Sequence, residues 1–400
     1  MSTSLHTLSV RSVITPTLDL STLAIHGGLF PDPSTGAILT PIHQTTTYVQ
    51  SAVGVDKGFT YTRSGNPTVA ALERNLGELD GGLPAVSFAT GMAALTALFL
   101  TLLKSGDEVV VSDVVYGGTV RLLRKVLEPL GIRSKFVDTS SIESLRGAVS
   151  RKTRLVLIET PANPTLKLTD IAAAAEVAHE AGALLAVDNT FLTPVLQRCF
   201  DLGADITVYS TTKHIEGHNA TVGGAVITRD AELRERLRFL QNAVGFAQAP
   251  FEAWITLRGI KTLPLRLERH SRNALTVARF LEDDSRIAKV LYPGLPSFPQ
   301  HELARRQHID HGGLIAFEVK GGARAGISLM NSVKLCALAE SLGAVETLIT
   351  HPASMTHATI PPDERERIGI SDGLVRLSVG LEAAEDVVAD LDQALDAKGA

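Results

Sequence analysis

Cysteine is scarce in this chain of 400 residues, which carries two, Cys199 and Cys336, far apart in the sequence. Two distant cysteines do not make the disulfide framework that stabilises small secreted domains. A reducing compartment is therefore expected, and we predict a cytoplasmic protein.

Long apolar segments are missing as well. The longest run, MAALTALFLTLL at 92–103, is shorter than the ~20 residues that cross a bilayer as a helix. The first residues, MSTSLHTLSVRSV, lack the apolar core of a secretory signal. We expect a short disordered arm here. Because the segment is rich in Ser and Thr and poor in acidic residues, a transit sequence for an organelle is the alternative.

An excess of positive charge is also absent. The chain has 38 Lys and Arg residues against 43 Asp and Glu residues, a net charge of −5, and no basic run. Such a protein is not expected to bind nucleic acid or an anionic membrane surface.

Several catalytic and nucleotide-binding motifs do not occur. The sequence has no G-x-G-x-x-G and no G-x-x-x-x-G-K-[ST]. This argues against a dinucleotide-binding protein and a P-loop enzyme. His301, His308 and His311 gather in HELARRQHIDHGG without an H-E-x-x-H motif. We therefore predict no metal site there and interpret these histidines as surface or interface residues.

What the sequence does contain is an alternation of strand-like and helix-like segments from about residue 64 onward. The predicted strands are apolar and amphipathic helices separate them, which favours a mostly parallel sheet with helices on both faces. A smaller α+β unit follows. We predict an α/β protein in three parts: an N-terminal arm at 1–62 that contacts a neighbouring subunit, a large domain at 63–258, and a C-terminal domain at 259–400.

Polar residues stand where the predicted strands end. Asp188 follows LLAV, Asn163 follows LVLIE within TPANP, and Lys213 follows ITVY within STTK. Ligands of such sheets bind beyond the carboxyl ends of the strands. These side chains are therefore expected to line one crevice.

Each of these features has an ordinary explanation when taken alone: a tight strand–helix turn at ATGMAAL, a helix-cap Asp188 and a solvated Lys213. Together they indicate one cofactor. A helix N-terminus binds phosphate, a desolvated lysine condenses with an aldehyde, and a buried aspartate keeps a heteroaromatic nitrogen protonated. We therefore predict pyridoxal 5′-phosphate (PLP).

The order of several short motifs is similar to that of a known family. YTRSGNPT, FATGMAAL, DVVYGGT, ETPANP, VDNTF, STTKHIEGH, AESLG and VRLSVGLE follow one another along the chain. In this respect the sequence resembles, from about residue 20 to the C-terminus, the trans-sulfuration enzymes. These form the Cys/Met-metabolism branch of the fold-type I PLP-dependent enzymes.

The resemblance implies roles for the residues of the crevice. Lys213 would form the Schiff base with the cofactor, and Asp188 would pair with its pyridine nitrogen. Tyr116 would stack on its ring, and Asn163 would lie near the 3-oxygen and the substrate. The phosphate would be held by Gly91, Met92, Ser210 and Thr212.

Further roles are implied around the substrate and at a subunit contact. Arg376 would clamp the substrate carboxylate, a geometry that guanidinium suits. Ser354 would lie beside this clamp and help to place Lys213. Tyr61 and Arg63 would reach the phosphate in a neighbouring subunit. Active sites would then be shared within a dimer, and a homotetramer would be the usual assembly.

The implied reaction is the loss or exchange of a γ-substituent from a sulfur-containing or O-acylated amino acid. Lys213 would take the α-proton. Tyr116 would either give a proton to the leaving group or only stack on the ring.

A few positions bear on the choice of substrate. Glu340 and Arg121 are similar to residues of the cystathionine γ-lyase group, and Gly118 stands where methionine γ-lyases carry cysteine. Thr60 and GHNATVGG instead depart from the pattern of the enzymes that handle cystathionine. We predict a cystathionine γ-lyase or γ-synthase. An O-acetylhomoserine or O-succinylhomoserine sulfhydrylase or a methionine γ-lyase is the alternative, and a catalytically silent paralogue is the alternative outside enzymes.

Overall fold

The structure is a computed structural model that describes residues 18–358 and 360–397. The predicted disordered arm at residues 1–13 therefore lies outside the described residues.

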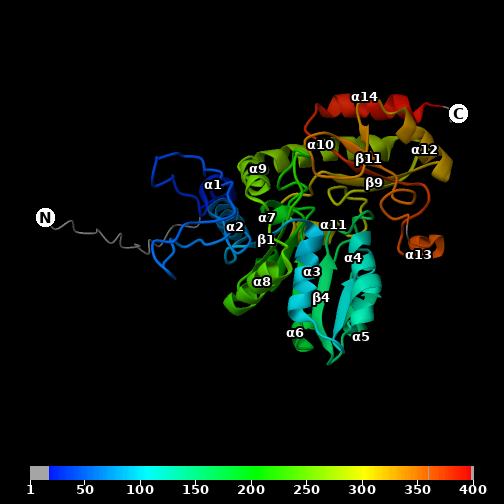
Figure 1. Ribbon diagram of the computed structural model, residues 1–400. Coiled ribbons are helices and arrows are strands. Elements are labelled where there is room, and N and C mark those ends of the chain that lie inside the picture. The colour runs from blue at the N-terminus through cyan, green and yellow to red at the C-terminus, as the bar shows by residue number, and fades with distance from the viewer. Residues whose placement is uncertain (1–17, 359, 398–400) are drawn as a thin grey trace.

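A seven-stranded sheet forms the centre of the larger part of the molecule (Figure 1). Its strand order is β1-β7-β6-β5-β4-β2-β3; the run from β6 to β3 is parallel, and β1 and β7 are antiparallel to their neighbours. The strands are β1 (Val86–Phe88), β2 (Glu108–Ser112), β3 (Arg133–Val137), β4 (Thr153–Glu159), β5 (Leu184–Asp188), β6 (Ile206–Tyr209) and β7 (Gly224–Thr228). The prediction of a mostly parallel sheet is confirmed.

Helices cover both faces of this sheet, which explains why its central strands are apolar on both sides. Residues of α3, α4 and α8 share one apolar cluster with β1, β2 and β6. Residues of α5 and α6 cover the opposite face over β4 and β5, and α2 and α9 continue this layer. The helices are α1 (Leu20–His26), α2 (Pro67–Asp80), α3 (Gly91–Leu102), α4 (Gly117–Leu122), α5 (Ile142–Ala148), α6 (Ile171–Glu180), α7 (Thr193–Leu196), α8 (Ala231–Val244) and α9 (Pro250–Ile260). A π-helix (Leu123–Leu127) and two 3-10 helices (Glu128–Leu130 and Cys199–Leu202) complete this part.

A second sheet of five strands follows, in the order β10-β11-β12-β9-β8. Its pairs are antiparallel except β10 with β11. The strands are β8 (Ile287–Leu291), β9 (Leu314–Val319), β10 (Ala337–Leu338), β11 (Leu348–Thr350) and β12 (Leu374–Ser378). The helices of this part are α10 (Leu263–Asp283), α11 (His301–Gln307), α12 (Gly322–Ser332), α13 (Pro362–Arg367) and α14 (Ala384–Leu395).

The two sheets are joined by a long helix and by a shared apolar cluster. The first turns of α10 pack with α2 and α9, and its later turns pack with α12 and α14 over the second sheet. Phe191 and Ala162, from loops of the large sheet, pack with Leu314 and Leu374 of β9 and β12. This packing brings β12 to the edge of the large sheet where the parallel strands end. We retain the boundaries at 62 and 258 as proposed domain limits.

Within the described part of the chain, none of the helices combines the length and the hydrophobicity that crossing a membrane requires.

Candidate active site

A cavity of about 320 Å³ lies between the carboxyl ends of the parallel strands and the second sheet. Both parts of the molecule contribute side chains to it. The predicted site residues that line this cavity are Gly91, Met92, Tyr116, Asn163, Asp188, Ser210, Thr212, Lys213, Glu340 and Arg376. The structure thus brings together residues separated by up to 285 positions in the sequence, from 91 to 376.

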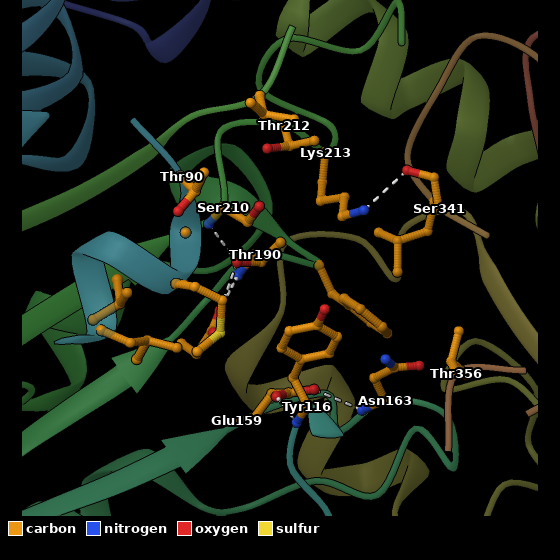
Figure 2. A pocket seen from close by; sticks show the side chains of 18 of the residues that line it. Thr90, Tyr116, Glu159, Asn163, Thr190, Ser210, Thr212, Lys213, Ser341 and Thr356 are labelled. Atoms are coloured by element: carbon orange, nitrogen blue, oxygen red, sulfur yellow. Dashed lines mark hydrogen bonds between the residues drawn. The ribbon is translucent and has the colours of Figure 1, made fainter. Parts of the chain in front are cut away.

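Lys213 lies in the turn after β6, with its side chain directed into the cavity (Figure 2). Its Nζ donates a hydrogen bond to Ser341 Oγ at 2.9 Å. Burial and the charge of Arg376 lower the pKa of Lys213 to about 8, and Glu340 acts in the opposite direction. An amine that loses its proton this readily is available as a nucleophile and as a base.

Asp188 is the last residue of β5 and lines the same cavity. Its Oδ1 accepts hydrogen bonds from the hydroxyl of Thr190 at 2.6 Å and from the N–H of Thr190 at 3.1 Å. Burial raises the pKa of Asp188, which these bonds only partly offset. A carboxylate in such a place is stabilised by a cation, as a protonated ring nitrogen would provide.

The start of α3 forms a cradle for an anion. Thr90 caps the helix by accepting from Ala93 N at 3.0 Å, and the backbone N–H of Ala94 donates to the Thr90 carbonyl at 3.1 Å. The N–H groups of Gly91 and Met92 belong to the first turn of α3, where N–H groups have no acceptor within the helix. A Cβ at Gly91 would lie 2.9 Å from Ser210 Cβ, so glycine lets the helix start approach Ser210. The resulting site has the donors that a phosphate dianion needs.

Tyr116 immediately precedes α4, and its ring lies along the cavity (Figure 2). A Cβ at Gly118 would lie 2.4 Å from Tyr116 Cε1 and 2.8 Å from Met92 Sδ. Glycine at position 118 therefore lets the tyrosine ring pack back against the chain. A larger residue there would have to displace that ring.

Arg376 reaches the cavity from β12 and is 2% exposed. Its guanidinium donates to Asn163 Oδ1 at 2.9 Å, to the Ser341 carbonyl at 2.6 Å and to Thr350 Oγ1 at 3.2 Å. Burial lowers the pKa of Arg376 to about 10, although Glu340 and Glu159 counteract this. Among the residues that the structure describes, its buried Nε has no hydrogen-bond partner. A buried donor without a partner is costly.

Two predicted positions, Ser354 and Arg121, are not among the residues that line the cavity, and their predicted roles stay predictions. The hydroxyl of Ser354 is bonded to His351 Nδ1 at 2.7 Å, and the serine at the Lys213 amine is Ser341. Arg121 lies on the exposed side of α4 and does not line the cavity.

Tyr61 and Arg63 also lie outside the cavity of their own chain. Tyr61 is 44% exposed, and Arg63 donates to the carbonyl and the side-chain oxygen of Asn242 at 2.7 and 2.6 Å. Their predicted role is in a neighbouring subunit, and it stays a prediction.

Sequence reasoning missed several lining residues. Ser341 directly follows Glu340 in AESLG, and Glu159 is the first residue of ETPANP, so both belonged to motifs already noted. Thr190 and Thr356 also line the cavity. Only the folded contacts show that Ser341 meets Lys213 and that Glu159 meets the backbone of Tyr116.

The histidine cluster holds a close pair: the Nδ1 atoms of His308 and His311 are 3.5 Å apart. Among residues 18–358 and 360–397, no group of three or more His, Cys, Asp or Glu side chains is placed to hold a metal ion.

Comparison with known proteins points to one family. The sequence matches the family described as "Cys/Met metabolism PLP-dependent enzyme" over residues 21–396. Cystathionine γ-lyase of Dictyostelium discoideum is 48% identical over 378 residues, which is 94% of this chain and 97% of that protein. Cystathionine β-lyase of Coxiella burnetii is 47% identical over 378 residues, with 94% and 97% coverage.

Two further proteins are similar over nearly their whole length. Cystathionine γ-synthase of Mycobacterium bovis is 46% identical over 376 residues, with 94% of this chain and 96% of that protein covered. The crystal structure of metB from Corynebacterium glutamicum matches with a TM-score of 0.93 at 44% identity, covering 95% of this chain and 98% of that one.

Proposed function

The chain belongs to the Cys/Met-metabolism family of PLP-dependent enzymes, and from this premise we propose that it removes or exchanges the γ-substituent of cystathionine or of a homoserine-derived amino acid. The predicted family, fold class and cofactor are confirmed: it is a trans-sulfuration enzyme of fold type I that uses PLP. Which member of this group it is, and which residue does what, belongs to the proposal.

For the cofactor, we assign each group to the residue whose chemistry fits it. Lys213 binds the aldehyde, Asp188 keeps the ring nitrogen protonated, and the ring of Tyr116 stacks on the cofactor ring. The phosphate is held by Gly91, Met92, Ser210 and Thr212. When bound, PLP supplies an electron sink for the electron pair left at the substrate Cα.

For the substrate, the proposal assigns binding and proton transfer to groups from both sheets. Arg376, which lines the cavity, binds the α-carboxylate, and Asn163 orients Arg376 through their hydrogen bond. The Lys213 amine takes the α-proton, since its lowered pKa of about 8 makes it a base near neutral pH. Tyr116, which lines the cavity, either gives a proton to the leaving group or acts only through stacking.

The observation that carries the proposal is the shared cavity. A lysine amine of lowered pKa, a buried carboxylate and a buried guanidinium line one space of about 320 Å³. Glu340 lines this space as well, and we propose that it selects a substrate with a distal ammonium group, as cystathionine has.

A second candidate, β-elimination, is favoured by the relatives, since those named cystathionine β-lyase, at 46–47% identity, are nearly as similar as the γ-lyase at 48%. Product analysis separates the candidates. Cystathionine and water give cysteine, 2-oxobutanoate and ammonia if the γ-bond breaks, and homocysteine, pyruvate and ammonia if the β-bond breaks. An O-acylhomoserine with cysteine gives cystathionine and the free acid if the enzyme is a γ-synthase. If the enzyme uses sulfide as a co-substrate or releases methanethiol from methionine, and neither cleaves nor forms cystathionine, the cystathionine assignment is rejected.

We further propose a homotetramer made of two dimers. Within each dimer the two subunits share their active sites, and Tyr61 and Arg63 of one subunit reach the phosphate site of the other. Residues 27–66, beside α1 in Figure 1, contain no helix and no named strand. This segment leaves Phe30 75%, Val49 90% and Val53 102% exposed. Apolar side chains so exposed on one segment favour a protein partner.

Hybrid dimers test this assembly. Co-expression of Arg63→Met with Lys213→Ala, each inactive alone, should restore part of the activity, because one site of the hybrid is complete. The control pair, Lys213→Ala with Arg376→Lys, should give no more activity than Arg376→Lys alone, because both residues serve the site of their own chain. No recovery in the first pair would reject the sharing of sites.

For the compartment we keep the cytoplasm as a proposal. Both cysteines are buried free thiols, which is compatible with a reducing environment.

A further inference from the structure

Glu159 is a buried carboxylate at the cavity to which the proposed chemistry assigns no role. It is the last residue of β4 and is 5% exposed. Its Cα is the register partner of Asp188 on β5. Two carboxylates therefore stand side by side at the same edge of the sheet, and both line the cavity.

The two oxygens of Glu159 hold two different loops (Figure 2). Oε2 accepts the backbone N–H of Tyr116 at 2.8 Å, and Oε1 accepts the backbone N–H of Asn163 at 2.8 Å. Asn163 Oδ1 in turn accepts from Arg376 at 2.9 Å. One side chain is thus linked to the stacking ring and, through Asn163, to the carboxylate clamp.

The loops need this acceptor because the local chain offers none. The N–H of Tyr116 stands before the first turn of α4, where a helix leaves its N–H groups unsatisfied. Asn163 lies in a loop between Pro161 and Pro164, and its own N–H is buried with it. Buried N–H groups require a partner, and a carboxylate accepts both through charge-assisted bonds.

We propose that Glu159 is a positioning residue that sets the place of the Tyr116 ring over the cofactor and the orientation of the Asn163–Arg376 pair toward the substrate carboxylate. This inference rests on the roles proposed for those three residues. It deepens them by naming the group that holds the two sides of the cavity in register.

The surroundings of Glu159 argue against a role in stability alone. Burial and the neighbouring Asp188 raise the pKa of Glu159 to about 8, so its environment disfavours the ionised form. A buried carboxyl group beside a second one weakens the fold unless other contacts compensate. A neutral residue would be the better choice for stability.

Two separate variants, each of which replaces one buried carboxyl group by an amide, test the proposal. Glu159→Gln keeps the shape but places an amide nitrogen opposite one of the two N–H donors. The matched control is Asp390→Asn in α14. Asp390 is 6% exposed and accepts the backbone N–H groups of Lys334, Leu335 and Cys336 at 2.7–2.8 Å. It does not line the cavity. Both variants, loaded with PLP, are compared with wild type by visible circular dichroism of the bound cofactor, by thermal midpoint and by steady-state kinetics.

For Glu159→Gln we expect an altered cofactor dichroism and a KM for the amino-acid substrate raised about tenfold, the size of one lost hydrogen bond to a charged group, with little change in thermal midpoint. For Asp390→Asn we expect a lowered midpoint with unchanged dichroism and KM. If Glu159→Gln does not fold, Glu159→Asp, whose carboxylate is one carbon short of spanning both donors, should show the same changes.

Unchanged dichroism in a folded Glu159 variant would overturn the proposal. This readout needs only bound PLP, so it decides the inference even if cystathionine proves not to be the substrate.

Discussion

The two sides of the cavity are built in different ways. On the seven-stranded sheet, Asp188 and Lys213 stand at or just after the ends of parallel strands. On the five-stranded sheet, Arg376 stands within β12, with Thr350 and Ala316 beside it in register. Parallel strands deliver their end loops to one edge, whereas an antiparallel strand sends alternate side chains to its two faces. On the large sheet, the loops after several strands together form the proposed cofactor site. On the small sheet, the alternation of side chains along β12 places the guanidinium of Arg376 at the cavity.

The loop that contains Ser341 contacts both sides. The hydroxyl of Ser341 accepts from the Lys213 amine at 2.9 Å, and its carbonyl accepts from Arg376 at 2.6 Å. Glu340, the residue before it, raises the pKa of Lys213, while Arg376 lowers it. Substitutions on the large sheet should therefore affect cofactor binding, those on the small sheet substrate binding, and those in the loop both.

The largest effect is expected for Lys213→Ala. Loss of the amine removes both the group that binds PLP and the base, and a general base alone contributes roughly 10²–10⁴-fold to the rate. The variant should be colourless after incubation with PLP and dialysis, and its kcat should fall about 10⁴-fold. The exposed Lys289→Ala is the control and should stay yellow and active. If the Lys213→Ala variant were yellow and active, the assignment of the large-sheet side of the cavity to cofactor binding would be contradicted.

Arg376→Lys should separate the sides next most clearly. Lysine cannot reproduce the planar donor set that contacts Asn163, Ser341 and Thr350. We expect KM for the amino acid to rise about 10–100-fold, since hydrogen bonds to charged groups contribute about 1.5–3 kcal/mol, while the visible spectrum of bound PLP stays as in wild type. Arg324→Lys, at an exposed position, should change neither. A lost spectrum in Arg376→Lys would place this residue on the cofactor side.

The pH dependence of cofactor uptake should report the coupling of the sides. The unprotonated amine is the reactive form, so the rate at which the apo protein takes up PLP should rise with pH and level off above the Lys213 pKa of about 8. Glu340→Gln removes a charge that raises this pKa and should shift the curve to lower pH. Arg376→Met removes a charge that lowers it and should shift the curve to higher pH. Stopped-flow absorbance measures the rates, and shifts of the opposite sign would contradict the assignment.

The smallest effect is expected for Ser341→Ala. The variant loses one neutral partner of the Lys213 amine, worth about 0.5–1.5 kcal/mol, and should lower kcat by about two- to tenfold. Ser354→Ala, whose hydroxyl contacts His351, should leave kcat near wild type. If the two serine variants exchanged these outcomes, the predicted role of Ser354 would be supported.

The strand-end residues were predictable because they follow from local pattern. Asp188 and Lys213 are preceded by apolar strands, and parallel topology alone brings such ends together. Ser341 was not predictable in this way. Its loop packs on the Lys213 turn, where Val345 N donates to the Gly217 carbonyl at 2.9 Å and a Cβ at Gly343 would lie 2.6 Å from His214 N. These contacts join segments more than a hundred positions apart.

The sequence by itself determined the residue types and the alternation of strands and helices, and with them the cofactor chemistry, because strand ends and helix starts depend on near neighbours in the chain. Tertiary structure alone decided which serine meets the lysine, that Glu159 holds both Tyr116 and Asn163, and that Arg121 stays outside the cavity. Hydrogen bonds between distant segments depend on distances of a few tenths of an ångström, and only the packing of the two sheets sets these distances.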